Sequence, residues 1–562
     1  MKKITIFIFA LLLSALSLPA QEIFDLIASG DVQAVKALIE RSPEVLAVRM
    51  TNGSTPLHLA AVRDRRDIVA VLIGKGAALE ARDDYGRTPL ILCARERGQA
   101  ATGRVLLDAG AEINALDKFG DSALDLAAWR GKADFVDLLL EKGAKVPTAG
   151  PKLGSLLSLS ASQGLTTLFG RLVEGGGDLK AAADRSLLHA AAAGGSARII
   201  ASLLDLGIDP AARDRFGWTP LHYAARDGRT EAVRTLIERG APLDERSLMG
   251  QTAYDVAVER KMAPAAALLA EKGADTSGIR FPALLGEYLG QKPPAAASEL
   301  FGLGIISSIW GLHSTAVFSP DGSEVLWAPM IDIPGELYAQ GGLLMMRRVD
   351  GRWTAPAWAP YSGPDVKDDV PFYSADGKRV YFISARPLPG GGTGEKERIW
   401  YVDRIASGWS EPRPLDPALN DHPMHWSFSL DRKGDLYFSG QGPDSRGMSD
   451  IYVSRFVDGR HQKPVNLGDP ISTAQPESTP FVAPDGSYLI FSRQYDLWVS
   501  FRGTDGAWMS PIKLGPEVNS PGIELCPVVT ADGKYLFFLS GRDGESHAYW
   551  VRLDRIEALK RK

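Results

Sequence analysis

The feature that most constrains this chain is a sequence repeat of 33 or 34 residues in its first half. Copies start at residues 53, 86, 120, 184, 217 and 250, and the clearest read GSTPLHLAA (53–61), GRTPLILCA (86–94) and GWTPLHYAA (217–225). Threonine followed by proline favours the start of a helix, because the hydroxyl caps free N–H groups and proline lacks an N–H that the first turn would leave unbonded. A second apolar stretch at helical spacing follows in most copies and ends at a glycine. The pattern predicts stacked pairs of helices.

In period and motif, this region resembles the ankyrin repeat family. The resemblance implies an all-α solenoid over residues 21–280, with about eight helix pairs that start near residues 22, 53, 86, 120, 153, 184, 217 and 250. The first pair lacks the threonine-proline motif and is expected to cap the stack. The fifth pair departs from the pattern around residues 156–177, and this irregularity permits a bend in the solenoid at that point. His58, His189 and His222 lie inside the repeated motif and are expected to brace the turns through local hydrogen bonds.

Ankyrin proteins project hairpin tips toward their partners, and the resemblance implies the same here. Aromatic and methionine side chains are enriched at the centres of protein interfaces. Five such residues flank the repeat glycines and are the candidate partner contacts: Tyr85, Phe119, Phe216, Trp218 and Met249. The alternative is that these residues only pack on the neighbouring tip.

The character of the sequence changes near residue 300. Ten of the twelve tryptophans lie from Trp310 to Trp550, together with most of the apolar-polar alternation that is typical of strands. A second repeat places an aspartate at 321, 376, 431, 485 and 532, in segments such as FSPDGSEVLW (318–327) and YSADGKRVYF (373–382). Asp-Gly between two apolar runs predicts a tight hairpin. Two further strand-like runs per copy give four strands in about 50 residues, which is typical of a propeller blade.

The second half is similar to the β-propeller of the periplasmic component of the Tol-Pal system and to related WD-like repeats. The resemblance implies an all-β propeller over residues 303–562, so the chain is predicted to be multidomain. Five hairpins predict five blades, and six blades are the alternative. Because the chain ends soon after Val551, the missing outer strand is expected from residues 303–308, which would close the ring and remove exposed strand edges. Residues 281–302, marked by prolines, are predicted to be a linker.

Residues just before the first strand of each hairpin are expected to approach the axis of the ring. Counting eight residues back from the repeat aspartates, and adding polar neighbours, gives the candidate channel residues His313, Asp368, Asp369, His422, His425, Glu477 and Glu524. Imidazoles and carboxylates that converge on one channel mouth can bind a divalent metal or serve as an acid and a base. The alternative is that they only line a water-filled channel. No other cofactor is predicted.

The N-terminus has the pattern of a secretory signal peptide. Two lysines precede an apolar run over residues 4–18, and a segment of small residues ends at Ala20. The run is shorter than a bilayer requires, and no later stretch is long enough. The sequence therefore predicts that residues 1–20 are removed and that the mature protein has no membrane span and is exported to the periplasm or secreted, as is typical of a bacterial signal peptide.

Composition and motifs exclude several functional classes. With 63 Lys and Arg against 68 Asp and Glu, the chain lacks the basic excess of a general nucleic-acid binder. Two distant cysteines, Cys93 and Cys526, exclude a disulfide framework. The motifs of nucleophile-elbow hydrolases, HExxH metalloproteases, phosphate loops and dinucleotide-binding folds are absent.

Two hypotheses about function follow. The first is an exported, monomeric interaction scaffold: the ankyrin tips and concave face bind one protein partner, and the propeller binds a second partner or a component of the cell envelope. The alternative is a propeller-channel enzyme, or a sensor of a metal or other ligand, acting for example on a glycan.

Overall fold

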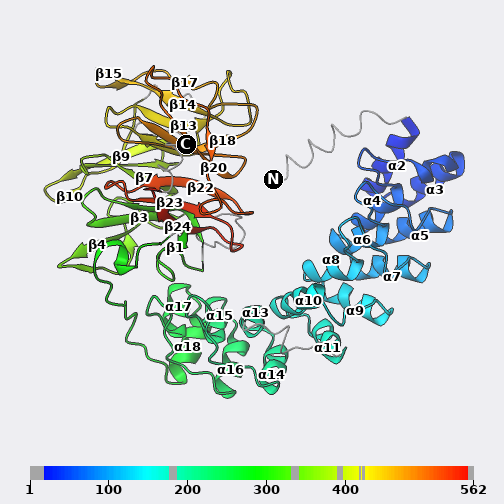
Figure 1. The fold of residues 1–562 in the computed structure, drawn as a ribbon. Coiled ribbons are helices and arrows are strands. Elements are labelled where there is room, and N and C mark those ends of the chain that lie inside the picture. Colours follow the sequence, from blue (N-terminus) through cyan, green and yellow to red (C-terminus); the bar gives the residue numbers. More distant parts are fainter. Residues whose placement is uncertain are drawn as a thin grey trace. The chain divides into compact units, whose positions relative to one another are not determined.

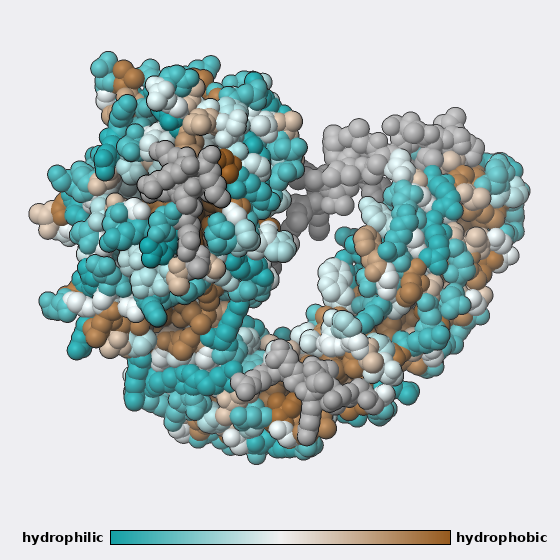
Figure 2. All heavy atoms as spheres, viewed as in Figure 1, coloured by the Kyte–Doolittle hydropathy of each residue, from teal (hydrophilic) through white to brown (hydrophobic). Residues whose placement is uncertain are grey.

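The structure, a computed structural model, describes residues 18–175, 186–295, 297–309, 311–330, 341–388, 397–416, 419 and 424–554, with the backbone alone for 18–19 and 424–426. The chain divides into two units (Figure 1; Figure 2 shows all heavy atoms in the same view). The first unit consists of Met1–Asp214, Trp218–Arg246 and Gln251–Ile279, and the second of Arg215–Gly217, Ser247–Gly250 and Arg280–Lys562. Helices fill the first unit and strands the second, as the two repeats predict.

The first unit is a stack of antiparallel helix pairs (Figure 1). The first helices of the pairs are α2 (Leu18–Ser29), α4 (Pro56–Val62), α6 (Pro89–Arg95), α8 (Ala123–Trp129), α10 (Pro151–Ser162), α13 (Ser186–Gly194), α15 (Pro220–Arg226) and α17 (Ala253–Glu259). The second helices are α3 (Val32–Arg41), α5 (Arg66–Gly74), α7 (Ala100–Asp108), α9 (Ala133–Glu141), α11 (Thr166–Glu174), α14 (Ala197–Asp205), α16 (Thr230–Glu238) and α18 (Ala263–Glu271). A 3-10 helix, η1 (Pro43–Ala47), follows α3. The described residues thus hold the predicted eight pairs.

Small residues allow successive pairs to pack closely. Ala60 and Ala61 of α4, like Ala224 and Ala225 of α15, are completely buried between neighbouring helices. One apolar core runs through the whole stack, from Ile23 onward. Each pair therefore buries its apolar face only against its neighbours, which is the physical basis of a solenoid.

The motif histidines brace the turns, as predicted. His58 lies at the third position of α4, where its Nδ1 accepts a hydrogen bond from the backbone N–H of Thr55 at 3.1 Å. Its Nε2 lies 3.0 Å from the carbonyl oxygen of Arg87 in the next repeat, so Nε2 carries the proton and donates it. His222 repeats both contacts, with the N–H of Thr219 and the carbonyl of Gln251. Each imidazole thus caps one helix and ties it to the following repeat.

This role predicts an acid-sensitive solenoid. Burial lowers the pKa of His58 and of His222 to about 4, whereas the unfolded chain titrates near 6.5. Between these values the unfolded state binds protons that the folded state does not, so the free energy of unfolding decreases as the pH falls. Lowering the pH from 7.5 to 5 should cost about 2 kcal/mol for each histidine, measured by urea unfolding followed by circular dichroism. A His58→Gln/His222→Gln variant should lose most of this pH dependence, and an unchanged pH dependence would contradict the assignment.

The second unit is a ring of five antiparallel sheets, which confirms five blades (Figure 1). Blade 1 contains β2 (Leu312–Phe318), β3 (Glu324–Pro329), β4 (Leu344–Val349), β5 (Arg352–Trp353) and β6 (Ala357–Trp358). Blade 2 contains β7 (Asp368–Tyr373), β8 (Arg379–Ser384), β9 (Arg398–Ile405), β10 (Gly408–Trp409) and β11 (Arg413–Pro414). Blade 3 contains β12 (Met424–Leu430), β13 (Leu436–Gly440), β14 (Asp450–Ser454) and β17 (Val465–Asn466), with the hairpin β15 (Phe456–Val457) and β16 (Arg460–His461). Blade 4 contains β18 (Glu477–Val482), β19 (Tyr488–Arg493), β20 (Asp496–Phe501) and β21 (Ile512–Lys513).

The last blade joins the two ends of the propeller sequence. It contains β22 (Glu524–Val529), β23 (Tyr535–Ser540), β24 (His547–Arg552) and β1 (Glu299–Leu300). Glu299 pairs with Trp550 and Leu300 with Tyr549. The predicted clasp is therefore present, but its strand lies just before residues 303–308 instead of within them. The reason is that residues 303–308 form a turn, in which the Ser307 hydroxyl bonds the backbone of β24.

Residues 281–302, predicted as a linker, pack onto the second unit. They include the 3-10 turn η2 (Glu287–Gly290), in which Tyr288 and Leu289 both have a positive φ. The ring of Tyr288 lies 5.1 Å from the rings of Phe318 and Tyr535 and 5.5 Å from that of Trp550 (centroid distances). This segment therefore adds an aromatic side chain to the seam between blades 1 and 5.

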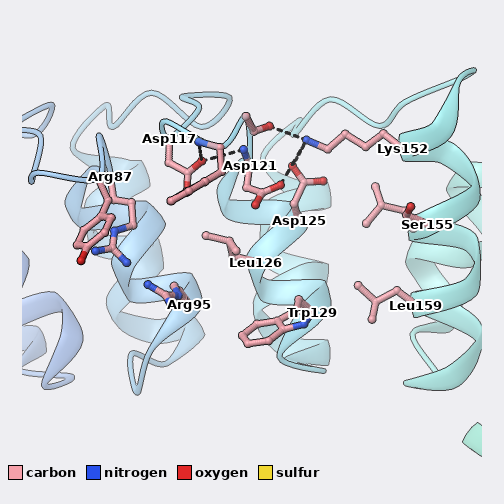
Figure 3. Close-up of a pocket in the computed structure, with 14 residues that line it drawn as sticks. Arg87, Arg95, Asp117, Asp121, Asp125, Leu126, Trp129, Lys152, Ser155 and Leu159 are labelled. Atoms are coloured by element: carbon pink, nitrogen blue, oxygen red, sulfur yellow. Dashed lines mark hydrogen bonds and ion pairs between the residues drawn. The ribbon is translucent and has the colours of Figure 1, made fainter. Parts of the chain in front are cut away.

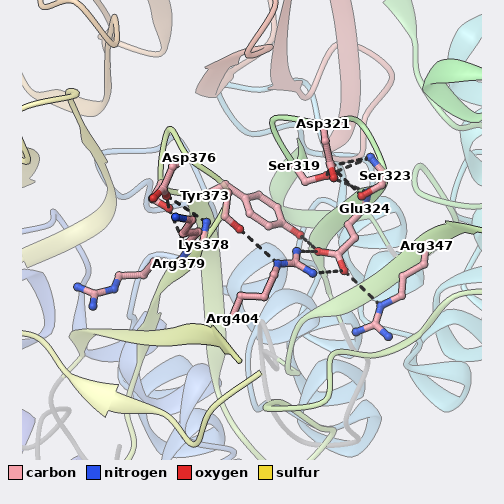
Figure 4. A network of polar contacts seen from close by, with 12 residues as sticks. Ser319, Asp321, Ser323, Glu324, Arg347, Tyr373, Asp376, Lys378, Arg379 and Arg404 are labelled. Carbon is pink, nitrogen blue, oxygen red and sulfur yellow. Dashed lines mark hydrogen bonds and ion pairs between the residues drawn. The ribbon is translucent and has the colours of Figure 1, made fainter. Parts of the chain in front are cut away.

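The blades are held together by side chains as well as by the clasp. In blade 1, the turn aspartate Asp321 accepts a hydrogen bond from the backbone N–H of Ser323 at 3.0 Å, which fixes the predicted hairpin. Buried Glu324 then accepts hydrogen bonds from Arg404 (2.6 Å) and Tyr373 (3.1 Å) of blade 2 (Figure 4). The same carboxylate pairs with Arg347 of its own blade at 3.3 Å. The carboxylate of Glu324 thus joins blade 1 to blade 2.

Candidate functional site

Two of the predicted tip residues form one exposed aromatic surface. The side chains of Tyr85 and Phe119 are 48 % and 73 % exposed, and their rings stack with centroids 6.5 Å apart. The tips that carry them are joined, because the backbone N–H of Lys118 donates to the carbonyl of Tyr85 at 2.9 Å. Adjacent repeats therefore hold the two rings side by side, with large areas left in contact with solvent.

The other three predicted contacts differ from this pair. Trp218 is buried, with its ring packed against those of His222 and Tyr223 of its own repeat. Phe216 and Met249 belong to the short segments 215–217 and 247–250, which group with the second unit. A role in partner binding stays a prediction for all five residues, and the structure brings only Tyr85 and Phe119 together.

A pocket of about 820 Å³ opens beside these two rings (Figure 3). We call it the ankyrin groove. It is lined by Tyr85, Arg87, Arg95, Asp117, Phe119, Gly120, Asp121, Asp125, Leu126, Trp129, Lys152, Ser155, Leu156 and Leu159. These residues come from α6, α8, α10 and the tips that precede α6 and α8. Trp129, the last residue of α8, is 52 % exposed and adds a third aromatic ring.

Charged side chains gather at the tip end of the ankyrin groove (Figure 3). Lys152 Nζ lies 2.7 Å from the carboxylate of Asp125 and 4.0 Å from that of Asp121, and it donates to the carbonyl of Gly120 at 2.8 Å. Asp125 also caps α8, accepting hydrogen bonds from the backbone and hydroxyl of Ser122. Lys152, at the start of α10, therefore fixes the neighbouring tip against the next helix pair.

Sequence reasoning did not find Trp129, Lys152 or Asp121. The prediction considered only residues that flank the repeat glycines. Trp129 instead is the last residue of α8, the first helix of its pair, and Lys152 lies in the irregular fifth repeat. One signal was available: Trp129 is one of two tryptophans in the first half, and it stands at a helix end where two other repeats carry Arg95 and Arg226.

In the second unit, the candidate channel residues lie on the innermost strands, as expected from the repeat. His313 lies on β2, Asp368 and Asp369 on β7, Glu477 on β18 and Glu524 on β22. His422 lies outside the described residues, and for His425 on β12 only the backbone is described. The structure does not gather the described candidates into one cluster.

Three of the carboxylates are ion-paired inside their own blades. Asp368 lies 2.7 Å from Arg386, Glu477 2.9 Å from Arg493, and Glu524 3.6 Å from Arg542. All three carboxylates are completely buried. Each also accepts a hydrogen bond from a nearby hydroxyl, donated in turn by Ser362, Thr473 and Ser520. A contact that repeats in three blades at equivalent positions is a structural device, because a single ligand site would need it only once.

His313 and Asp369 are the candidates that the structure does bring together. His313 Nδ1 is in direct hydrogen-bond contact with the Asp369 carboxylate, which joins blade 1 to blade 2. Burial acts to lower the pKa of His313, but Asp369 outweighs it, so the pKa is raised overall. The imidazole therefore holds its proton to a higher pH than an ordinary histidine does.

The axis of the ring offers little space among the described residues. One cavity of about 10 Å³ is lined by residues of all five innermost strands, and a second of about 70 Å³ lies on the same axis. Val317, Phe372, Phe481 and Val528 line both. A cavity of 10 Å³ holds about one water molecule. Within the described part of the chain, no group of three His, Cys, Asp or Glu side chains is arranged to hold a metal ion. A divalent metal in the channel stays a prediction.

Comparison with known proteins places the first unit in a family. Residues 23–117, 80–149, 157–247 and 187–278 match the sequence model of the family described as Ankyrin repeats (3 copies). The helical region is an array of ankyrin repeats. The matched residues lie within the first half, so the likeness of the propeller to that of the Tol-Pal periplasmic component stays a prediction.

Curated proteins share the repeats over short stretches. Ankyrin repeat and KH domain-containing protein 1 from Homo sapiens is 39 % identical over 104 residues, 18 % of this chain and 4 % of that protein. Ankyrin repeat and KH domain-containing protein mask from Drosophila melanogaster is 40 % identical over 109 residues, 19 % of this chain and 3 % of the relative. Nuclear factor NF-kappa-B p105 subunit from Gallus gallus is 32 % identical over 152 residues, which are 26 % of this chain and 14 % of that protein. The chain therefore covers only a small part of each relative.

These relatives correct the predicted location. A periplasmic or secreted protein with a bacterial signal peptide was expected, but the relatives are proteins of human, fly, worm and chicken instead of bacterial periplasmic proteins. The prediction was wrong because it depended on a short apolar pattern alone. Where the structure does describe it, residues Leu18–Ala20 open helix α2, and Ala20 is buried. The predicted cleavage point therefore lies inside a packed helix.

None of the helices that the structure describes is both long and apolar enough to cross a bilayer.

Proposed function

We propose that the protein is an interaction scaffold in which the ankyrin groove binds a segment of a protein partner. The observation that carries the proposal is the set of three exposed rings, Tyr85, Phe119 and Trp129, around one pocket of about 820 Å³. Exposed aromatic side chains at the edge of a preformed concavity are the usual anchors of a protein interface. The relatives are ankyrin repeat proteins, which supports protein binding by this region.

In this proposal the propeller binds a second partner. Three exposed apolar side chains lie on loops of blades 3 to 5: Met448 (79 %), Tyr495 (52 %) and Ile523 (46 %). The last two are adjacent, because the backbone N–H of Glu524 donates to the carbonyl of Tyr495 at 2.8 Å. The narrow axis of the ring makes these loops a better place for a macromolecular partner than the channel.

Site-specific photo-crosslinking in cells that express the protein tests both parts. A photoreactive residue at Phe119 should crosslink to one partner protein and one at Met448 to another, while the same residue at exposed Leu206, after α14, should crosslink to neither. Adding Trp129→Ser should reduce the Phe119 adduct about tenfold or more, since truncating an aromatic hot-spot residue costs about 2 kcal/mol or more of binding free energy. Equal yields at Leu206 and Phe119, or a yield that Trp129→Ser leaves unchanged, would overturn the groove assignment.

A further inference from the structure

The two ends of the ankyrin groove differ in chemistry. Asp117, Asp121 and Asp125 lie at the tip end, whereas Leu126, Trp129 and Leu159 lie farther along the helices (Figure 3). An occupant therefore meets carboxylates at one end of the groove and apolar or aromatic surface at the other. The chemistry of the partner can be inferred from the charges that lack a counter-charge at one end and from the apolar surface left exposed at the other.

The carboxylates at the tip end outnumber the cations. Asp117 is engaged by its own tip, where it accepts hydrogen bonds from the backbone N–H groups of Phe119 and Asp121. Lys152 makes its close ion pair with Asp125 and lies 4.0 Å from Asp121. Burial raises the pKa of Asp121, and the carboxylates of Asp117 and Asp125 raise it further. Asp121, with 43 % of its side chain exposed, is thus the carboxylate that a partner's cation would stabilise.

Each arginine that lines the groove already has a carboxylate partner. Arg87 is held by Asp83, whose Oδ2 lies 2.9 Å from both Nε and Nη2 of the guanidinium. Arg95 lies 3.6 Å from the carboxylate of Glu96. An acidic occupant would therefore have to compete with existing partners and would face the repulsion of three aspartates. The charge of the groove complements a basic partner.

The aromatic rings fit a basic partner as well. The guanidinium of Arg87 lies 4.2 Å from the centroid of Tyr85, and that of Arg130 lies 4.6 Å from the centroid of Trp129. Both rings remain about half exposed. Rings that already stack with cations in this structure present the electron-rich faces that lysine and arginine side chains prefer.

We infer that the occupant of the ankyrin groove is a basic-apolar peptide segment of the partner protein. A lysine or arginine of the segment pairs with Asp121, and a neighbouring aromatic or aliphatic residue packs on Leu126 and Trp129. This inference deepens the proposed function and rests on it.

Selection from a phage-displayed library of random 12-residue peptides on the full chain tests the inference. Phage are first depleted on a Phe119→Ser/Trp129→Ser variant, so that only peptides requiring the groove remain. The depleted pool should be enriched in peptides that carry lysine or arginine within a few residues of an aromatic or aliphatic side chain. A groove-dependent pool that is neutral or acidic would overturn this inference while leaving the proposed function intact. The absence of any groove-dependent peptide would overturn both.

Charge variants give a second, quantitative readout on a selected peptide. Asp121→Asn should weaken binding about fivefold at low salt and by less at 0.5 M NaCl, because a partly exposed ion pair is screened by salt. Asp137→Asn, an exposed carboxylate of α9 away from the groove, changes the net charge equally and should leave the affinity unchanged. Equal losses in the two variants would show a nonspecific charge effect and would overturn the pairing with Asp121. Circular dichroism should confirm that both variants remain folded.

Discussion

Replacing Trp550 with alanine should lower the free energy of unfolding of the propeller by about 3–5 kcal/mol. Trp550 is completely buried on β24, the strand that pairs with the clasp strand β1. Its ring lies within 5.5 Å of the ring centroids of Tyr288, Phe301 and Tyr535. The substitution removes a large apolar side chain at the point where the two ends of the ring are joined, and the closed ring can relax into the cavity only in part.

Trp129 provides the matched control for this experiment. It is 52 % exposed, so Trp129→Ala should change the free energy of unfolding by less than about 1 kcal/mol. Urea unfolding is followed by tryptophan fluorescence for the propeller, which holds ten of the twelve tryptophans, and by far-ultraviolet circular dichroism for the helices of the first unit. Equal losses of stability in the two variants would contradict the assignment of Trp550 to the closure of the ring. The control also separates stability from binding, since Trp129 is the residue that the groove requires.

Glu477→Ala should destabilise the propeller by about 3 kcal/mol. The carboxylate is fully buried, accepts hydrogen bonds from Thr473 (2.6 Å) and Arg493 (2.9 Å), and holds a loop against β19. Removing it leaves the largely buried guanidinium of Arg493 without its counter-charge, and breaking a buried pair from one side is costly. Glu477→Gln, which keeps a hydrogen-bond acceptor for Thr473, should lose about half as much.

This experiment also decides between two roles for Glu477. If the carboxylate served a channel ligand instead of the fold, its removal would leave the urea midpoint unchanged, and that result would restore the ligand hypothesis. Glu411→Ala, at an exposed position between β10 and β11, is the control and should shift the free energy of unfolding by no more than about 0.5 kcal/mol. The same measurement on Glu524→Ala would show whether the buried carboxylate–arginine pair stabilises blades 4 and 5 to the same extent.

Much of the local structure was predictable because each repeat encodes its own contacts. Thr55 and Pro56 start α4, and His58 bonds back to Thr55 within a single turn. Asp321 and Gly322 form their hairpin with residues a few positions away, and Gly322 has the positive φ that the turn requires. Interactions of this kind span at most five residues, so a pattern in the sequence is enough to locate them.

The candidate channel residues show where such reasoning stops. Their positions on the innermost strands followed from the repeat, but their partners did not. Asp368 pairs with Arg386, eighteen residues away, across two strands whose register the pattern does not specify. A buried carboxylate near the axis has the same sequence signature whether it binds a ligand or an arginine of its own blade. Only the paired geometry distinguishes the two.

The sequence by itself determined that the chain is built from two kinds of repeating unit, ankyrin helix pairs and then propeller blades, and it favoured five blades over six. It did so because the apolar spacing, the caps and the turns lie within one repeat. Tertiary structure alone decided which side chains of different repeats meet. Tyr85, Trp129 and Lys152 come from three repeats and share one groove. These side chains lie close together because of the rotation and translation that relate each helix pair to the next. Packing between repeats sets that displacement, so the motif of a single repeat does not specify it.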